Sequence, residues 1–172
     1  MKVYGDLRSV NFLKVKYVAE KLGISHEWQE VDVLSGITRS TAFLELNPAG
    51  QIPAVDFGDG HVLAQSNAIM RYLARNSSLI PTDPWQAAKM DEWLFWEQYS
   101  HEPSIAVVRF LRTFKNMPMA DIDARLIAKG NAALNMMDTH LGKNMWFTGN
   151  AISLADIALY AYTQFADEGS KR

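Results

Sequence analysis

The spacing of apolar residues changes once along this chain, and that change limits the folds open to it. Up to residue 76, short apolar segments typical of strands alternate with segments whose apolar residues recur at helical spacing. Residues 77–84 contain two prolines and no periodicity, and from Trp85 onward only helical spacing is found. The sequence therefore predicts an α/β domain over residues 1–76, a linker over residues 77–84 and an all-α domain over residues 85–172.

The order of the expected strands and helices in residues 1–76 indicates the fold of the first domain. Alternating or continuous apolar segments predict strands, and Gly58-Asp59-Gly60 predicts the turn of a hairpin. In chain order we expect a strand at Val3–Tyr4, a helix over Asn11–Leu22, a strand over His26–Val33, a short helix over Thr38–Leu46, a hairpin over Ile52–Ala64 and a helix over Ser66–Ala74. This order, βαβ followed by α, ββ and α, is that of a thioredoxin-like domain.

The second domain is expected to contain three helical segments. They run from Trp85 to about Arg112, from Ala120 to Leu141 and from Leu154 to Phe165. Pro103 lies inside the first of them. Because proline has no N–H and its ring clashes with the preceding turn, that helix should kink or end near Glu102.

Charge and hydropathy exclude several classes of function. Lys and Arg number 17 against 19 Asp and Glu, and the basic residues are scattered, so the chain lacks the basic patch of a nucleic-acid binder. The longest apolar run, Ile157–Tyr162, is far shorter than the roughly 20 residues of a membrane span, and the first residues do not resemble a secretory signal. We therefore expect a soluble cytoplasmic protein with no nucleic-acid or membrane partner.

The absence of cysteine restricts the chemistry further. Without cysteine there are no disulfides, no thiolate metal ligands and no mechanism that uses a protein thiol as nucleophile. The four histidines are far apart and lack the paired spacing of a metal site. The sequence therefore predicts neither a metal centre nor a catalytic thiol.

The segment Asn47-Pro48-Ala49-Gly50-Gln51-Ile52-Pro53 resembles the glutathione transferase family, which carries a cis proline before its third strand. A cis X-Pro bond costs only about 0.5–1 kcal/mol relative to trans, so proline can hold such a turn. The resemblance implies that Pro53 is cis and that the N–H and C=O of Ile52 pair with glutathione as an added strand would. The alternative is a plain loop with a trans proline.

A second segment, Gln65-Ser66-Asn67-Ala68-Ile69, resembles the part of the family that holds the γ-glutamyl end of glutathione. A helix N-terminus offers unpaired N–H groups and a partial positive charge, so the N–H and hydroxyl of Ser66 suit a carboxylate. The side-chain oxygen of Gln65 can accept a hydrogen bond from the ammonium group, where many family members carry glutamate. The alternative is that Ser66 only caps the helix, although capping and binding are compatible.

A third segment, Gly149–Asp156, resembles the capping box and hydrophobic staple of the family's helical domain. Ser153 would cap the helix, Asp156 would accept a hydrogen bond from the Ser153 N–H, and Ile152 would pack on the first turn. This motif is structural. Because the three segments follow the family's order, the chain is identified as a member of the glutathione transferase family, with a thioredoxin-like N-terminal domain and an all-helical C-terminal domain.

The family's reaction needs the glutathione thiol as a thiolate, and the pKa of a free cysteine thiol is about 8.5. A hydroxyl hydrogen bond to a charged acceptor is worth roughly 1.5–3 kcal/mol, which would lower the thiol pKa by about one to two units. Tyr4, Ser9 and Asn11 are the candidate donors near the first helix. The opening Tyr4–Ser9 is similar to theta-like and bacterial serine-type members. This resemblance implies that Ser9 is catalytic and that Asn11 helps to orient the thiolate, with Tyr4 and Asn11 as the alternative donors.

The resemblance also implies the partners of the chain. Glutathione would be the co-substrate, a small electrophile the second substrate, and Arg39 and Gln51 match the groups that hold the glycine carboxylate. The implied function is conjugation of the glutathione thiolate to the electrophile by a homodimer. The alternatives are a non-catalytic glutathione transferase-like binding module and a glutathione-dependent disulfide reductase.

The chain stops eleven residues after Ala161, whereas family members continue into further helices. The helical domain is therefore expected to be shortened. An apolar helix left bare would favour aggregation, so we expect either a truncated chain or an oligomer that covers this face.

Overall fold

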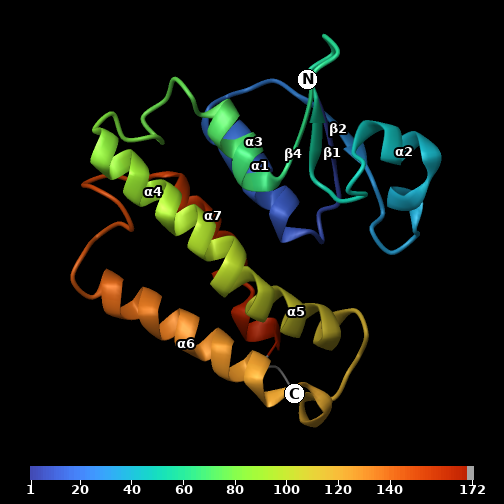
Figure 1. The fold of residues 1–172 in the computed structure, drawn as a ribbon. Coiled ribbons are helices and arrows are strands. Elements are labelled where there is room, and N and C mark those ends of the chain that lie inside the picture. Colours follow the sequence, from blue (N-terminus) through green and yellow to red (C-terminus); the bar gives the residue numbers. More distant parts are fainter. Residues whose placement is uncertain (170–172) are drawn as a thin grey trace. The chain divides into compact units, whose positions relative to one another are not determined.

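The computed structural model describes residues 1–169, and residues 170–172 of the predicted helical domain lie outside the described part. The chain forms two compact units, of which the first ends at Ile80 and the second begins at Pro81 (Figure 1). This border lies within residues 77–84, the segment predicted to join the two domains.

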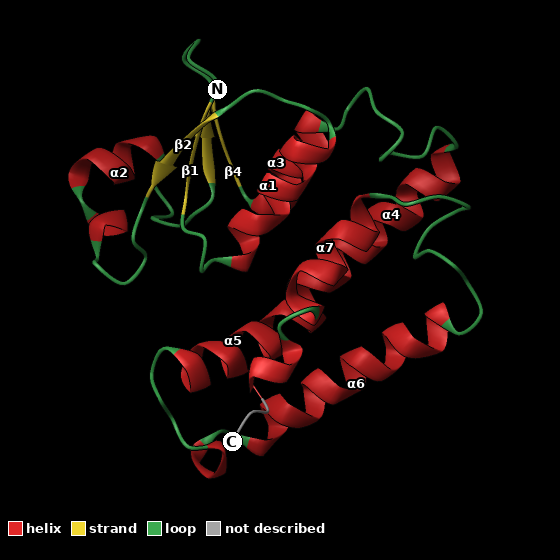
Figure 2. Cartoon of the chain, turned by 180° about the vertical axis from the view of Figure 1, so that it is seen from behind, coloured by secondary structure: helices red, strands yellow, loops and turns green. Residues whose placement is uncertain are grey.

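A four-stranded sheet forms the centre of the first unit. In the order in which they lie, its strands are β2 (Glu27–Glu30), β1 (Lys2–Gly5), β3 (Ala54–Asp56) and β4 (Val62–Ala64). β2 is parallel to β1, whereas β3 is antiparallel to both β1 and β4. The larger helices of the unit are α1 (Val10–Lys21), α2 (Thr41–Leu46) and α3 (Ser66–Leu73). α1 and α3 pack together on one side of the sheet and α2 lies on the other, which is the predicted thioredoxin-like arrangement (Figures 1 and 2).

Gly5 allows α1 to pack closely on β1. A Cβ atom at this position would lie 2.0 Å from Cδ2 of Phe12, so a larger residue would displace the Phe12 ring. The Phe12 ring in turn stacks on Trp28 of β2, with 5.7 Å between the ring centroids. Val55 of β3 and Ile69 of α3 are also fully buried. This core therefore fixes the start of α1 beside the end of β1.

The second unit is helical. Its helices are α4 (Pro84–Trp96), a π-helical segment (Glu97–His101), α5 (Glu102–Thr113), α6 (Ala124–Leu141) and α7 (Leu154–Thr163), with short 3₁₀ turns at Met119–Asp121 and Ala166–Gly169. α4 packs on α7, and α5 packs on α6. Pro103 occupies the first turn of α5, so the break expected near Glu102 is confirmed. None of the helices within residues 1–169 is long and apolar enough to cross a membrane.

The start of α7 has the predicted capping box. The Asp156 carboxylate accepts hydrogen bonds from the Ser153 N–H and hydroxyl, both at 2.8 Å. It also accepts one from the Phe147 N–H at 2.9 Å. Through these hydrogen bonds, Asp156 holds the loop before α7 against the first turn of that helix.

Candidate functional site

The register of the strands places three of the predicted segments at one end of the sheet. Tyr4 pairs with Ala54, and Ala54 pairs with Ala64. The residues that follow β1, precede β3 and follow β4 therefore lie at the same end. These residues are the turn that carries Ser9, the Ile52–Pro53 bond, and Gln65 with Ser66.

Ser9 is the N-cap residue of α1. Its backbone is extended, with φ −84° and ψ 114°, and its hydroxyl oxygen accepts a hydrogen bond from the Phe12 N–H at 3.4 Å. The Ser9 N–H donates to the Asp6 carbonyl at 2.8 Å. Because capping uses only the oxygen of the hydroxyl, its hydrogen can still donate to an anion at the N-terminus of α1, where the helix dipole favours negative charge.

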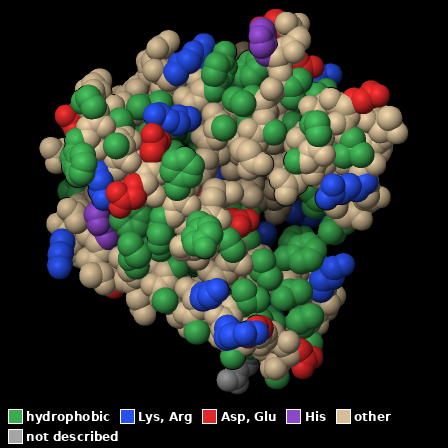
Figure 3. Space-filling model, viewed as in Figure 1, with side chains coloured by type: hydrophobic (Ala, Val, Ile, Leu, Met, Phe, Trp, Pro, Cys, Tyr) green, Lys and Arg blue, Asp and Glu red, His purple; other side chains and the backbone are tan. Residues whose placement is uncertain are grey.

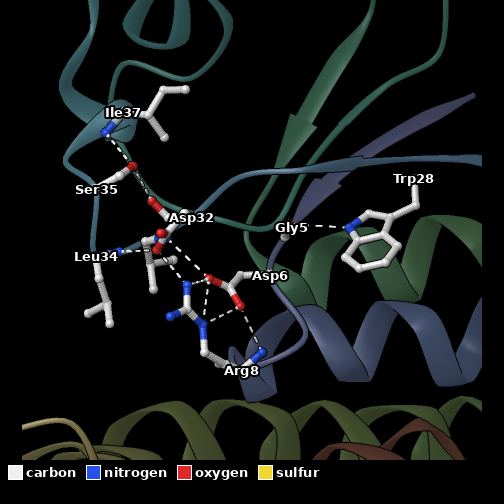
Figure 4. A network of polar contacts seen from close by, with 9 residues as sticks. Gly5, Asp6, Arg8, Trp28, Asp32, Leu34, Ser35 and Ile37 are labelled. Atoms are coloured by element: carbon white, nitrogen blue, oxygen red, sulfur yellow. Dashed lines mark hydrogen bonds and ion pairs between the residues drawn. The ribbon is translucent and has the colours of Figure 1, made fainter.

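A network of charged groups, which the sequence analysis did not identify, surrounds the turn before Ser9 (Figure 4). The Asp6 carboxylate accepts hydrogen bonds from the Arg8 N–H at 2.8 Å, from Arg8 Nη2 at 2.6 Å and from the Val33 N–H at 3.2 Å. Arg8 Nη2 also donates to Asp32 Oδ1 at 2.5 Å. The turn between β1 and α1 is thus joined to the segment that follows β2.

These contacts hold the network in its charged form. Burial by itself would raise the pKa of Asp6, but hydrogen bonds from Arg8 and from the Val33 N–H outweigh burial and keep this pKa below its ordinary value. The hydrogen bonds that the Arg8 guanidinium donates to Asp6 and Asp32 raise the pKa of Arg8. The Leu34 N–H, and then Arg8, lower the pKa of Asp32. All three groups are therefore charged at neutral pH.

Asn11 joins the N-termini of two helices. Its Oδ1 accepts a hydrogen bond from the Ser66 hydroxyl of α3 at 3.1 Å and one from Lys14 Nζ at 2.9 Å. Lys14 is fully buried and was also missed by the sequence analysis. The sequence shows a lysine between the apolar residues Leu13 and Val15, but it does not show that this lysine is buried.

The start of α3 differs from the expected cap. Gln65, not Ser66, occupies the N-cap position, and its side chain makes no capping hydrogen bond. The alternative in which Ser66 caps the helix is therefore wrong, because the buried Ser66 hydroxyl is directed to Asn11. Gln65 has φ 71° and ψ 112°, a conformation that residues other than glycine rarely adopt. Such conformations cost about 1–3 kcal/mol and often occur at functional sites.

The loop before β3 is held by the side chain of Asn47. Its Nδ2 donates to the Gln51 carbonyl at 2.7 Å, and its Oδ1 accepts from the Ala49 N–H at 3.2 Å. The Ile52–Pro53 bond is cis, which confirms the prediction made from the family pattern. Among the hydrogen bonds within residues 1–169, none involves the N–H or C=O of Ile52, so these two groups can pair with an extended ligand.

Arg39 lies against the same loop. Its Nη1 donates to the Ala49 carbonyl at 3.2 Å, and a Cβ atom on Gly50 would lie 2.6 Å from this nitrogen. Gly50 has φ 60°, so glycine is required there by both conformation and space. One donor of Arg39 thus supports the loop that carries Gln51.

Tyr4, the alternative donor, is directed elsewhere. Its ring packs edge-to-face on Phe43 of α2, with 6.4 Å between the centroids. α2 lies on the side of the sheet opposite α1 and α3 (Figure 1). The tyrosine ring therefore contacts α2, whereas Ser9 and Asn11 lie at the start of α1. No group of three His, Asp or Glu side chains in residues 1–169 is arranged to hold a metal ion.

Two family models match the chain. The model of the glutathione S-transferase N-terminal domain matches residues 9–76, and that of the C-terminal domain matches residues 106–169. Among curated relatives, glutathione S-transferase 3 of Zea mays is 32% identical over 165 residues, which cover 91% of this chain and 73% of the relative. Probable elongation factor 1-gamma 1 of Arabidopsis thaliana is 33% identical over 151 residues, but the match covers only 36% of that protein.

Solved structures give the same result. The glutathione S-transferase of Pseudomonas fluorescens Pf-5 superposes with a TM-score of 0.95 at 44% identity, over 99% of this chain and 86% of that one. A glutathione transferase of Pseudomonas putida, solved with one glutathione disulfide per subunit, gives a TM-score of 0.84 at 26% identity, over 96% of this chain and 75% of that one. This chain therefore belongs to the glutathione S-transferase family.

Proposed function

We propose that this chain is a glutathione transferase in which the Ser9 hydroxyl stabilises the thiolate of glutathione for attack on a small electrophile. The observation that supports this proposal best is the shared position of Ser9, Ile52 and Ser66 at one end of the sheet. A tripeptide lying across this end can reach a backbone edge, a helix N-terminus and a hydroxyl donor together. The theta-like, serine-type assignment is part of this proposal.

Glutathione is proposed to bind through three contacts. Its cysteinyl backbone pairs with the N–H and C=O of Ile52 beside cis-Pro53, as an added strand would. Its γ-glutamyl carboxylate lies at the N-terminus of α3 near Ser66, and its ammonium group donates to the Gln65 side chain. The glycine carboxylate lies near Arg39 and Gln51, which flank the loop before β3.

The chemistry proposed for Ser9 is simple. The thiol proton is lost to water, and the hydroxyl hydrogen of Ser9 donates to the sulfur anion while Asn11 orients it. With a chloronitrobenzene as electrophile, the sulfur lone pair forms the new C–S bond, and the C–Cl electron pair leaves with chloride. One charged hydrogen bond worth roughly 1.5–3 kcal/mol lowers the thiol pKa by about one to two units.

Replacing Ser9 tests this proposal. Ser9→Ala should reduce conjugation at neutral pH about ten- to a hundredfold, change glutathione binding little, and recover part of its rate as pH rises. Ser40→Ala is the matched control, because the Ser40 hydroxyl caps α2 through the Phe43 N–H at 3.3 Å, much as Ser9 caps α1. If Ser9→Ala keeps full activity at neutral pH while Tyr4→Phe or Asn11→Ala loses it, the Ser9 assignment is wrong.

A non-catalytic binding module is the second candidate function. The match to part of elongation factor 1-gamma favours it, because that relative contains a segment similar to this chain and is not named as a transferase. A chain that binds glutathione in calorimetry yet conjugates no electrophile would support this candidate.

A glutathione-dependent disulfide reductase is the third candidate. It is favoured by the glutathione disulfide in the Pseudomonas putida structure and is compatible with a chain that has no cysteine. Binding of two glutathione molecules per subunit, together with reduction of a mixed disulfide, would support it over conjugation.

We also propose a homodimer, because aromatic side chains of α4 and the segment after it are strongly exposed. Phe95 is 77% exposed and Tyr99 is 88% exposed. Over α4 and α5, apolar side chains reach the surface between charged ones (Figure 3). Large exposed aromatic residues are enriched at protein interfaces, so this face suits a second copy of the chain.

A further inference from the structure

The turn that carries Ser9 is held in place by an ion pair between Asp6 and Arg8. Asp6 is only 2% exposed, and Arg8 binds its carboxylate through Nε and Nη2 as well as through the backbone N–H. Two parallel charge-assisted hydrogen bonds of this kind fix direction as well as distance. Ser9 follows Arg8 directly, and its own N–H donates to the Asp6 carbonyl. The backbone of the turn therefore has little freedom while the Asp6–Arg8 pair is intact.

Arg8 extends the anchor to a second segment. Its Nη2 donates to Asp32 Oδ1 at 2.5 Å, and the same oxygen accepts from the Leu34 N–H at 2.8 Å. The Val33 N–H, from the same segment, donates to the Asp6 carboxylate at 3.2 Å. One guanidinium thus joins the Ser9 turn to the residues between β2 and the 3₁₀ turn Ile37–Arg39.

The chain contains the same Asp-x-Arg spacing a second time, at the start of α6. Arg125 donates to Asp123 through its N–H at 2.9 Å and through Nη2 at 2.8 Å, almost as Arg8 does to Asp6. This second pair is exposed, and Asp123 is the N-cap residue of α6. At α6, the Asp-x-Arg pair therefore acts as a helix cap. The pair beside Ser9 differs in two ways, because the Asp6 carboxylate is buried and a third charged residue, Asp32, binds Arg8.

We propose that Asp6 and Arg8, with Asp32, are positioning residues that hold the Ser9 hydroxyl where it can donate to the thiolate. This inference rests on the proposed function of Ser9. It assigns no direct contact with glutathione to Arg8. Because Arg8 lowers the pKa of Asp6, the pair remains charged, and the turn anchored, at the pH of the reaction.

Two Arg8 variants separate positioning from charge. Arg8→Lys keeps the positive charge but loses the planar guanidinium, which donates to Asp6 through two nitrogens. Arg8→Gln loses both the charge and the guanidinium. If Arg8 positions Ser9, both variants should raise the pKa of the bound glutathione thiol by about one unit, equivalent to about a tenfold loss of conjugation at neutral pH. The ultraviolet absorbance of the thiolate reports this pKa without an electrophile. Full retention of the low pKa in Arg8→Lys would overturn the inference in favour of charge alone.

Matched controls separate this role from general stability. Arg125→Gln removes the equivalent arginine at α6 and should leave the thiol pKa unchanged. Asp32→Asn removes the negative charge of the exposed bridge but keeps an acceptor oxygen for the Leu34 N–H, so it is expected to fold and to raise the thiol pKa less than Arg8→Gln does. An unchanged thiol pKa in well-folded Arg8→Gln and Asp32→Asn would contradict the inference.

A double-mutant cycle tests whether Arg8 acts through Ser9. In a Ser9→Ala background, Arg8→Gln should cause no further rise in thiol pKa, because the hydroxyl that it positions is absent. Additive effects would instead show a separate action of Arg8 and overturn the inference. If Ser9→Ala alone leaves the thiol pKa unchanged, the proposed function fails; if Ser9→Ala raises it and Arg8→Gln does not, only the positioning role fails.

Discussion

Gln65 combines a strained backbone with a proposed binding role, so stability and function should conflict at this residue. Glycine adopts its φ of 71° without strain. Gln65→Gly should therefore raise the free energy of unfolding by about 1 kcal/mol, after the greater flexibility of the unfolded glycine is subtracted. The same change removes the proposed acceptor for the ammonium group. It should weaken glutathione binding roughly tenfold or more, measured by calorimetry.

Two further variants control this prediction. Asn116 also has a positive φ, of 51°, but lies in the loop after α5, so Asn116→Gly should leave glutathione binding unchanged. Gln65→Glu keeps the side-chain length and adds a negative charge, which should tighten binding of the ammonium group. Unchanged affinity in both Gln65 variants would remove Gln65 from the proposed site.

Single residues could be predicted from the sequence where a family pattern marks them. Ser9, Asn11 and Ser66 were predicted from such patterns, and the structure places Asn11 within hydrogen-bonding distance of Ser66. Asp6 and Lys14 could not be predicted in this way. Their importance depends on burial, and burial follows from how α1 and the segment after β2 pack, which residue spacing does not specify.

Capping residues explain where the elements differ from the sequence prediction. The helix expected over Thr38–Leu46 is divided into a 3₁₀ turn and α2, because Ser40 is extended and caps α2. Likewise, α6 begins at Ala124 and not near Ala120, because Asp123 caps it through the Arg125 N–H. Apolar periodicity predicts that a helix exists, whereas local hydrogen bonds set its first residue.

The capping box of α7 gives a prediction about relative stability. Ser153→Ala removes one cap and should lower the free energy of unfolding by about 0.5–2 kcal/mol. Asp156→Ala should cost more, because the Asp156 carboxylate accepts from the Phe147 N–H as well as from Ser153. Thermal or denaturant unfolding of both variants measures the order. A smaller loss in Asp156→Ala than in Ser153→Ala would contradict this account of the loop.

At the scale of the whole molecule, the residues proposed to bind glutathione all lie in the first compact unit, between Met1 and Ile80. The strongly exposed aromatic residues Phe95 and Tyr99 belong to the second. Binding of glutathione and association of subunits are therefore proposed for different parts of the chain. Variants on the aromatic face can test association without changing Ser9, Ile52 or Ser66.

In a two-fold dimer, one substitution on this face would change both sides of the interface. In a symmetric interface, each change occurs on both subunits, so Phe95→Glu would introduce two carboxylates and the cost of burying both. Light scattering of the wild-type chain at micromolar concentration should give about twice 19.4 kDa, and Phe95→Glu should shift it toward 19.4 kDa. Met145→Glu is the matched control, because Met145 is 83% exposed but lies in the loop after α6. A wild-type mass of 19.4 kDa, or equal dissociation by both variants, would exclude this face as the dimer interface.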